Sequence, residues 1–88
     1  MITIHKFKLE LIQIQEVVSP PMEFLSVQYQ NNDITVWAVV DTDIEESKTT
    51  FKIVGTGRPF PDRNSWHYVG TVQQDTFVWH IFSKRNRR

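Results

Sequence analysis

Apolar and polar residues alternate along most of this chain, and a period of two is the pattern of β-strands. The alternation predicts seven strands, at residues 2–11, 12–18, 24–29, 34–40, 49–54, 66–72 and 76–82. The acidic stretch 41–48 has room for one helical turn, and the β-branched spacing elsewhere favours strands over helices. The expected fold is therefore all-β, a small antiparallel β-sandwich or a partly open barrel of about seven strands.

Turn residues separate these segments. Ser19-Pro20-Pro21 is a firm break, and Asn31-Asn32-Asp33 has the composition of a tight hairpin turn between 24–29 and 34–40. A second hairpin is expected about Gln73-Gln74-Asp75. In the first strand the apolar residues fall on even positions at Ile2 and Ile4 and on odd positions from Phe7 onward. This switch near His5-Lys6 predicts a bulge or a change of sheet there.

Two strands are apolar on both faces. Residues 34–40 place Trp37 and Val39 opposite a fully aliphatic face, and residues 76–82 place Phe77, Trp79 and Ile81 opposite Val78, His80 and Phe82. Such strands are central in a fold or covered by another subunit. An 88-residue chain has little material with which to cover both, so a homo-oligomer is expected.

The strand ending at Val54 runs into a stiff loop, Gly55-Thr56-Gly57-Arg58-Pro59-Phe60-Pro61. Glycine reaches positive φ without a Cβ clash, so Gly55 and Gly57 suit a bulge or a sharp change of direction. Free backbone N–H groups and a planar guanidinium at Arg58 are groups that bind anions. The alternative is a strand-ending turn with a solvated arginine, because the loop lacks the Lys-Ser/Thr of a nucleotide-binding P-loop. Phe60, held between two prolines, is expected to fill an edge of the core.

Longer motifs add a resemblance. The segments EFLSVQYQNNDITVWAVVD, FKIVGTGRPFPD and YVGTVQQDTFVWHIF, in this order, resemble a family of short phage and prophage proteins of unassigned function that carry GTGxP and WHxF motifs. The resemblance covers about residues 5–82. It implies a viral origin and a location in the host bacterial cytoplasm, and it implies no catalytic residues. The chain departs from the family pattern in having Arg58 where a histidine is frequent, and in its basic end.

Composition places limits on the chemistry. The length predicts one domain, residues 1–83, followed by a basic C-terminal tail, 84–88. The net charge is zero, but residues 1–83 hold six basic and ten acidic side chains, and the remaining cations lie in the tail at Lys84, Arg85, Arg87 and Arg88. There is no cysteine and no apolar run long enough to cross a membrane.

Few residue constellations suggest catalysis. The three histidines, His5, His67 and His80, lack metal-ligand spacing, and His80 is expected to bond a backbone carbonyl. Asp62 and His67 could meet as an acid–base pair, although capping of the turn is the expected role of Asp62. We therefore expect neither an enzyme nor a bound cofactor or metal.

These observations favour a phage accessory protein that acts by binding, most plausibly to a host protein, in host takeover or anti-defence. The expected contact residues are Gly55, Thr56, Gly57, Arg58, Trp66 and Tyr68, because arginine and aromatic side chains anchor interfaces. One alternative is sequestration of a nucleotide signal at the Gly55–Arg58 loop. Another is nucleic-acid binding through Lys84, Arg85, Arg87 and Arg88, which the acidic body disfavours.

Overall fold

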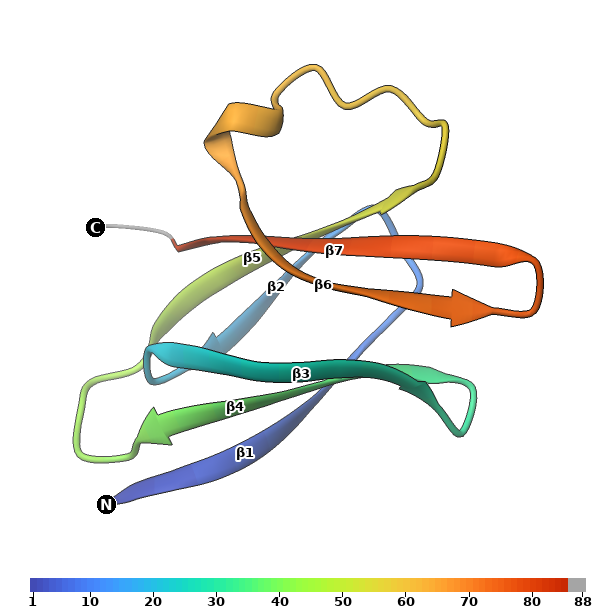
Figure 1. Cartoon of the computed structure of the whole chain (residues 1–88). Coiled ribbons are helices and arrows are strands. Elements are labelled where there is room, and N and C mark those ends of the chain that lie inside the picture. Colours follow the sequence, from blue (N-terminus) through green and yellow to red (C-terminus); the bar gives the residue numbers. More distant parts are fainter. Residues whose placement is uncertain (86–88) are drawn as a thin grey trace.

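The computed structural model describes residues 1–85 as two antiparallel sheets packed face to face (Figure 1). Sheet A has the strand order β1-β4-β3, and sheet B has the order β2-β5-β7-β6. Within these residues there is no α-helix, one 3-10 turn, η1 (Arg63–Ser65), and no helical segment that could span a bilayer. The strands are β1 (Ile2–Leu9), β2 (Ile14–Ser19), β3 (Met22–Gln30), β4 (Asp33–Asp41), β5 (Ser47–Gly55), β6 (His67–Gln74) and β7 (Phe77–Arg85). The predicted all-β fold of seven strands is confirmed, and the arrangement is an open sandwich.

Both predicted hairpins are present. Asn31 and Asn32 have φ values of 52° and 68°, so two residues in left-handed geometry join β3 to β4. Asp75, with a φ of 54°, lies in the turn between β6 and β7. Asparagine and aspartate tolerate this backbone region better than other residues with a Cβ, which explains why the sequence located both turns.

The prediction of a bulge at His5-Lys6 is wrong. β1 pairs with β4 in one continuous register from Ile2 to Leu9. The apolar phase switches because Phe7 and Leu9 face the sheet–sheet core, whereas Ile2 and Ile4 lie on the outer face of sheet A and are exposed. The chain changes sheets after β1, through residues 10–13, and the register shifts occur in β3 and β6, at residues 25 and 69.

The core lies between the inner faces of the two sheets. β4 and β5 contribute most of its fully buried side chains, and the cluster consists of Leu9, Ile34, Val36, Phe51, Ile53, Val72 and Ile81. On one side of the sandwich β3 packs directly against β6. Gly70 permits this approach, because a Cβ at that position would lie 2.1 Å from Cγ1 of Val27. Tyr29 and Gln74 add a 2.9 Å hydrogen bond between the same strands.

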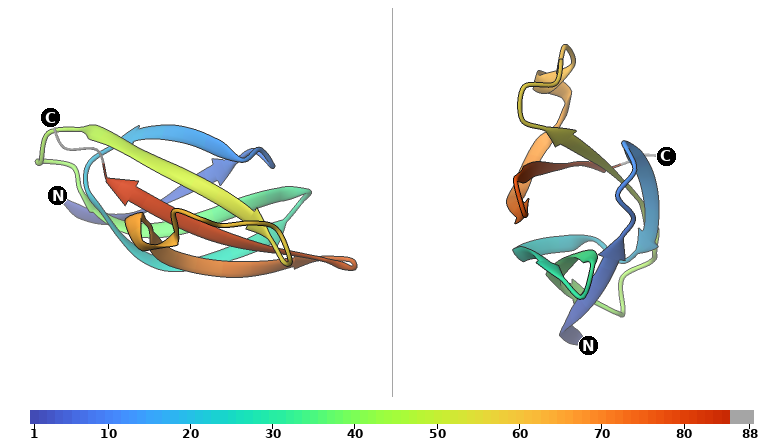
Figure 2. Two further views of the ribbon diagram at one scale, coloured as in Figure 1. Left: turned by 90° about the horizontal axis from the view of Figure 1, so that it is seen from above. Right: turned by 90° about the vertical axis from the view of Figure 1, so that its right-hand side faces the viewer.

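A second, smaller cluster lies on the outer face of sheet B. The loop between β5 and β6 projects from this face, on the side away from sheet A (Figure 2, right). Its Phe60 and Trp66 pack on Val54 and Phe82, so Phe60 fills this outer cluster and not the edge of the main core. The second apolar face of β7 is therefore covered in part by the chain's own loop. The corresponding face of β4, with Trp37 and Val39, has no such cover within residues 1–85 and stays partly exposed.

β7 continues through Lys84 and Arg85, which pair with Thr50 and Thr49 of β5. The strand thus extends two residues into the segment assigned from the sequence to a basic tail. Arg87 and Arg88, the other cations of that segment, lie outside the described residues.

Candidate functional site

A groove of about 660 Å³ opens at the end of sheet B where β5 enters its loop. Three segments distant in sequence form its walls: the connection between β1 and β2, the end of β5 with the start of the β5–β6 loop, and β7, which contributes Trp79. Its apolar lining includes Leu11, Ile12, Ile53, Val54, Pro59 and Trp79, with Arg58 and Lys52 as its two cations. We call this feature the Arg58 groove.

Gly55 lines the Arg58 groove, and because it has no side chain, two other side chains can approach its backbone. A Cβ at Gly55 would lie 3.1 Å from Cζ3 of Trp79 and 3.5 Å from Cγ of Arg58, so the indole and the aliphatic stem of Arg58 both pack on this residue. Gly57 has a φ of 85° and turns the chain, while the Arg58 N–H donates a 3.1 Å hydrogen bond to the Gly55 carbonyl. The predicted sharp change of direction is therefore real.

The two cations of the Arg58 groove differ in their partners. Lys52 is nearly buried and donates a 3.0 Å hydrogen bond to Oδ1 of Asp62, while Trp66 Nε1 donates a 2.9 Å hydrogen bond to Oδ2 of the same carboxylate. These two donors, the indole first and the ammonium second, lower the pKa of Asp62 to about 2. The Arg58 guanidinium has no hydrogen bond or ion pair within residues 1–85, so no acidic group of these residues neutralises its charge.

Asp62 therefore does not play either role considered from the sequence. It occupies the N-cap position of η1, but its side chain makes no capping hydrogen bond. It makes none with His67 either; its oxygens bond Lys52 and Trp66. The contact holds the β5–β6 loop against sheet B.

A chain of polar side chains runs from the loop across the outer face of sheet B. Thr56 Oγ1 lies 2.8 Å from Nε2 of His80, Nδ1 of His80 lies 3.0 Å from Thr71 Oγ1, and that oxygen lies 2.6 Å from the Tyr68 hydroxyl. The expectation that His80 bonds a backbone carbonyl is wrong, because Thr71 and Thr56 flank its ring on either side. This series of hydrogen-bonded side chains connects two predicted contact residues, Thr56 and Tyr68, through His80 of β7 and Thr71 of β6.

This arrangement has part of the geometry of a nucleophile and base, since a hydroxyl lies beside an imidazole. Two features argue against such chemistry. The group on the far side of His80 is a hydroxyl and not a carboxylate that would stabilise an imidazolium. The Thr56 N–H donates to the Val78 carbonyl at 3.2 Å and is not available to an oxyanion. No cluster of three metal-ligating side chains occurs in residues 1–85.

The structure brings some of the predicted contact residues together and separates others. Gly55 and Arg58 line the Arg58 groove, whereas Tyr68 is 56% exposed on the neighbouring surface. Trp66 is 6% exposed and packs under the β5–β6 loop against Val54 and Phe82. The sequence did not indicate the groove residues Leu11, Ile12, Lys52 and Trp79, which lie up to 68 residues apart and carry no shared motif.

Two basic residues, Lys84 near the end of β7 and Arg63 of η1, lie beside the aromatic cluster on the outer face of sheet B. Lys84 Nζ lies 5.0 Å from the centroid of the Trp66 ring, and the Arg63 guanidinium lies 5.0 Å from that of Phe82. Arg63 also donates a 2.8 Å hydrogen bond to the Trp66 carbonyl. These cations contribute to holding the loop, and Arg85 is exposed at the end of the strand.

The fold and groove define a small two-sheet β-sandwich with an apolar cleft beside Arg58, which has no ion-pair partner in the described part of the chain. The chain belongs to the family described as a domain of unknown function, DUF7352, whose profile matches residues 1–88. No curated protein and no solved structure matches it significantly.

Proposed function

We propose that this domain is a phage- or prophage-encoded protein of the host cytoplasm that acts by binding, and that its target is a bacterial host protein. The observation that carries the proposal is the Arg58 groove, an apolar cleft with one unpaired guanidinium. Such a site complements a protein segment that presents an apolar side chain next to a carboxylate. The apolar group would displace water from the lining, and the carboxylate would form a charge-assisted bond with Arg58.

Sequestration of a nucleotide signal is the second candidate. The groove volume of about 660 Å³ supports it, because small-molecule sites usually enclose roughly 300–1,000 Å³. The charge distribution favours a protein carboxylate instead. A nucleotide carries several phosphate charges, and the Lys52 ammonium is already engaged by Asp62, which leaves Arg58 as the unengaged cation of the groove.

The test is affinity capture from bacterial lysate with the intact protein, followed by calorimetry on the captured partner. Arg58→Ala and Ile12→Asp alter the groove from two distant segments, and both side chains are exposed enough that the fold should tolerate the changes. Lys48→Ala, which removes an exposed cation of β5 away from the groove, is the matched control. We expect the native protein to capture one host protein in a stoichiometric amount. Neither groove variant should capture it, and the Lys48→Ala control should still do so.

Other outcomes would redirect the proposal. A partner retained by both groove variants would show that the groove is not the binding site. A nucleotide bound in place of protein would favour the sequestering role, and a ligand at about 100 times its dissociation constant would stabilise the fold by about 2.7 kcal/mol. If the protein captured nucleic acid, and if this capture weakened with salt and disappeared on deletion of residues 84–88, the result would favour nucleic-acid binding through the basic segment.

A further inference from the structure

Part of the outer face of sheet A is apolar, and its side chains stay exposed or partly exposed in the structure of residues 1–85. Ile2 and Ile4 are 73% and 58% exposed, Leu25 is 50% exposed, and Trp37 and Val39 are partly exposed beside them. The strand register places Ile2, Ile4, Trp37 and Val39 on the side of the sheet that faces away from the core, and the exposed Leu25 lies at the register shift of β3 beside Trp37. We call these five residues the sheet A patch.

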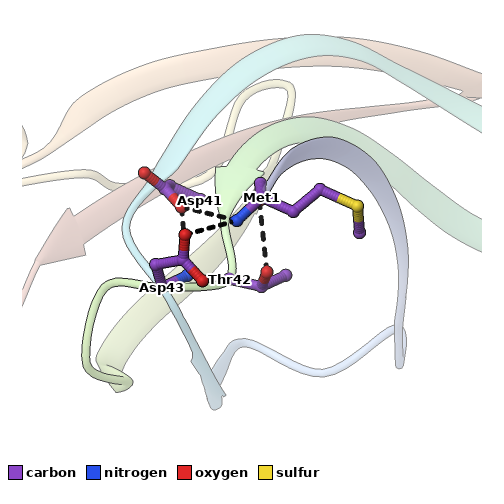
Figure 3. A network of polar contacts seen from close by, with 4 residues as sticks. All are labelled: Met1, Asp41, Thr42 and Asp43. Atoms are coloured by element: carbon purple, nitrogen blue, oxygen red, sulfur yellow. Dashed lines mark hydrogen bonds and ion pairs between the residues drawn. The ribbon is translucent and has the colours of Figure 1, made fainter.

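The start of β1, which carries Ile2 and Ile4 at one edge of this patch, is bonded to the end of β4. The Met1 amino group lies 2.7 Å from Oδ2 of Asp43 and 3.3 Å from Oδ1 of Asp41, and Thr42 donates from its backbone N–H to the Met1 carbonyl at 2.9 Å (Figure 3). The Asp43 N–H also donates a 3.0 Å hydrogen bond to Oδ1 of Asp41, and this bond is the chief cause that lowers the pKa of Asp41. The Asp43 carboxylate is the chief cause that raises the pKa of the Met1 amino group. The start of β1, with Ile2 and Ile4, is thereby fixed beside β4 instead of fraying.

Charges lie on opposite sides of the sheet A patch. Lys6 of β1 pairs across from Trp37, and Glu23 of β3 pairs across from Val39, so a cation and an anion lie on the two edges with β4 between them. Neither side chain forms an ion pair within residues 1–85. A two-fold axis along β4 would place the β1 edge of one copy over the β3 edge of the other.

We propose that a second copy of this chain covers the sheet A patch, in a two-fold dimer with the axis along β4. This packing stacks Trp37 and Val39 of the two copies at the centre and brings each Lys6 toward Glu23 of the other copy. The charges of this surface are self-complementary about an axis along β4, as an isologous interface requires. It lies on the opposite sheet from the Arg58 groove, so the inference does not depend on the proposed function.

Sedimentation equilibrium at protein concentrations from about 1 to 300 µM measures the mass of the assembly. A dimer dissociation constant within this range would correspond to a specific interface of modest affinity. We expect twice the 10.4 kDa chain mass for the native protein and a monomer for Ile4→Lys. Val18→Lys is the matched control, because Val18 is an equally exposed apolar residue, at 58%, on the outer face of sheet B. It should leave the dimer intact, and circular dichroism should show that all variants fold.

Charge reversal tests the orientation. Lys6→Glu and Glu23→Lys alone should each weaken the dimer about tenfold or more, because each places like charges together twice. The double variant should restore most of the loss. A native protein that stays monomeric throughout the range, an Ile4→Lys variant that remains dimeric, or a double variant no better than the singles would each overturn the proposed interface.

Discussion

At Gly70 and Val27, β6 and β3 approach each other closely, and this contact allows a quantitative prediction. In Gly70→Ala the new Cβ would lie 2.1 Å from Cγ1 of Val27, whereas unstrained carbon contacts are about 3.5–4.0 Å. One of the strands must move by about 1.5 Å, because the β-branched Val27 has a stiff χ1 and cannot simply rotate away. Overpacking of this kind costs about 1–3 kcal/mol.

Thermal unfolding followed by circular dichroism measures this cost. For a domain of this size about 2 kcal/mol corresponds to a melting temperature lower by about 8–16 °C. The decisive comparison is Val27→Ala, which removes the clashing methyl group but leaves the Val27 Cβ position, 3.4 Å from the new atom. Adding Gly70→Ala to that background should cost almost nothing, so the two substitutions should couple by about 1–3 kcal/mol.

A control separates crowding from backbone strain. Gly57→Ala has open space around the new Cβ but a φ of 85°, so it should cost about 1–2 kcal/mol irrespective of residue 27. If Gly70→Ala destabilised the native and Val27→Ala backgrounds equally, the steric argument would be refuted, and the close packing of β3 on β6 would not be the reason for a glycine here.

Two further predictions concern the β5–β6 loop. The carboxylate of Asp62 has a native pKa of about 2 against a usual value of 3.8, so its contribution to stability is complete above about pH 4 and is lost as the pH falls toward 2. The difference in melting temperature between native protein and Asp62→Asn should therefore shrink across that interval, and a difference independent of pH would contradict the assigned bonds. Thr56→Val removes the hydroxyl beside His80, and hydrogen exchange at the Thr56 and Arg58 amides should accelerate; unchanged protection would mean that the polar chain does not hold the loop.

Much of the fold was predictable because its signals are local. The alternation of Ile34, Val36 and Ala38 with polar or aromatic neighbours marks a strand wherever it lies in space, and Asn31-Asn32 tolerates the left-handed backbone of the turn. The bulge expected at His5 was wrong for an instructive reason. A change in apolar phase was interpreted as a change in backbone, whereas the regular strand carries apolar residues on an outward face.

The candidate site was less predictable. Gly55 and Arg58 were found because glycine and arginine near proline are conspicuous in sequence. Leu11 and Ile12 have ordinary side chains, and only the path of the chain from sheet A to sheet B brings them opposite Pro59 and Trp79. Nor did the sequence indicate that Asp62 engages Lys52, which leaves Arg58 as the unpaired cation of the groove.

The sequence by itself therefore determined the strands, their two faces and the turns between them, since a period of two and left-handed turn residues depend on near neighbours alone. The tertiary structure decided which sheet each strand joins and what covers each apolar face: the β5–β6 loop for Phe82 of β7, and nothing within residues 1–85 for Trp37 of β4. The reason is that alternation shows that a face is apolar without identifying its partner. That partner depends on contacts between segments far apart along the chain.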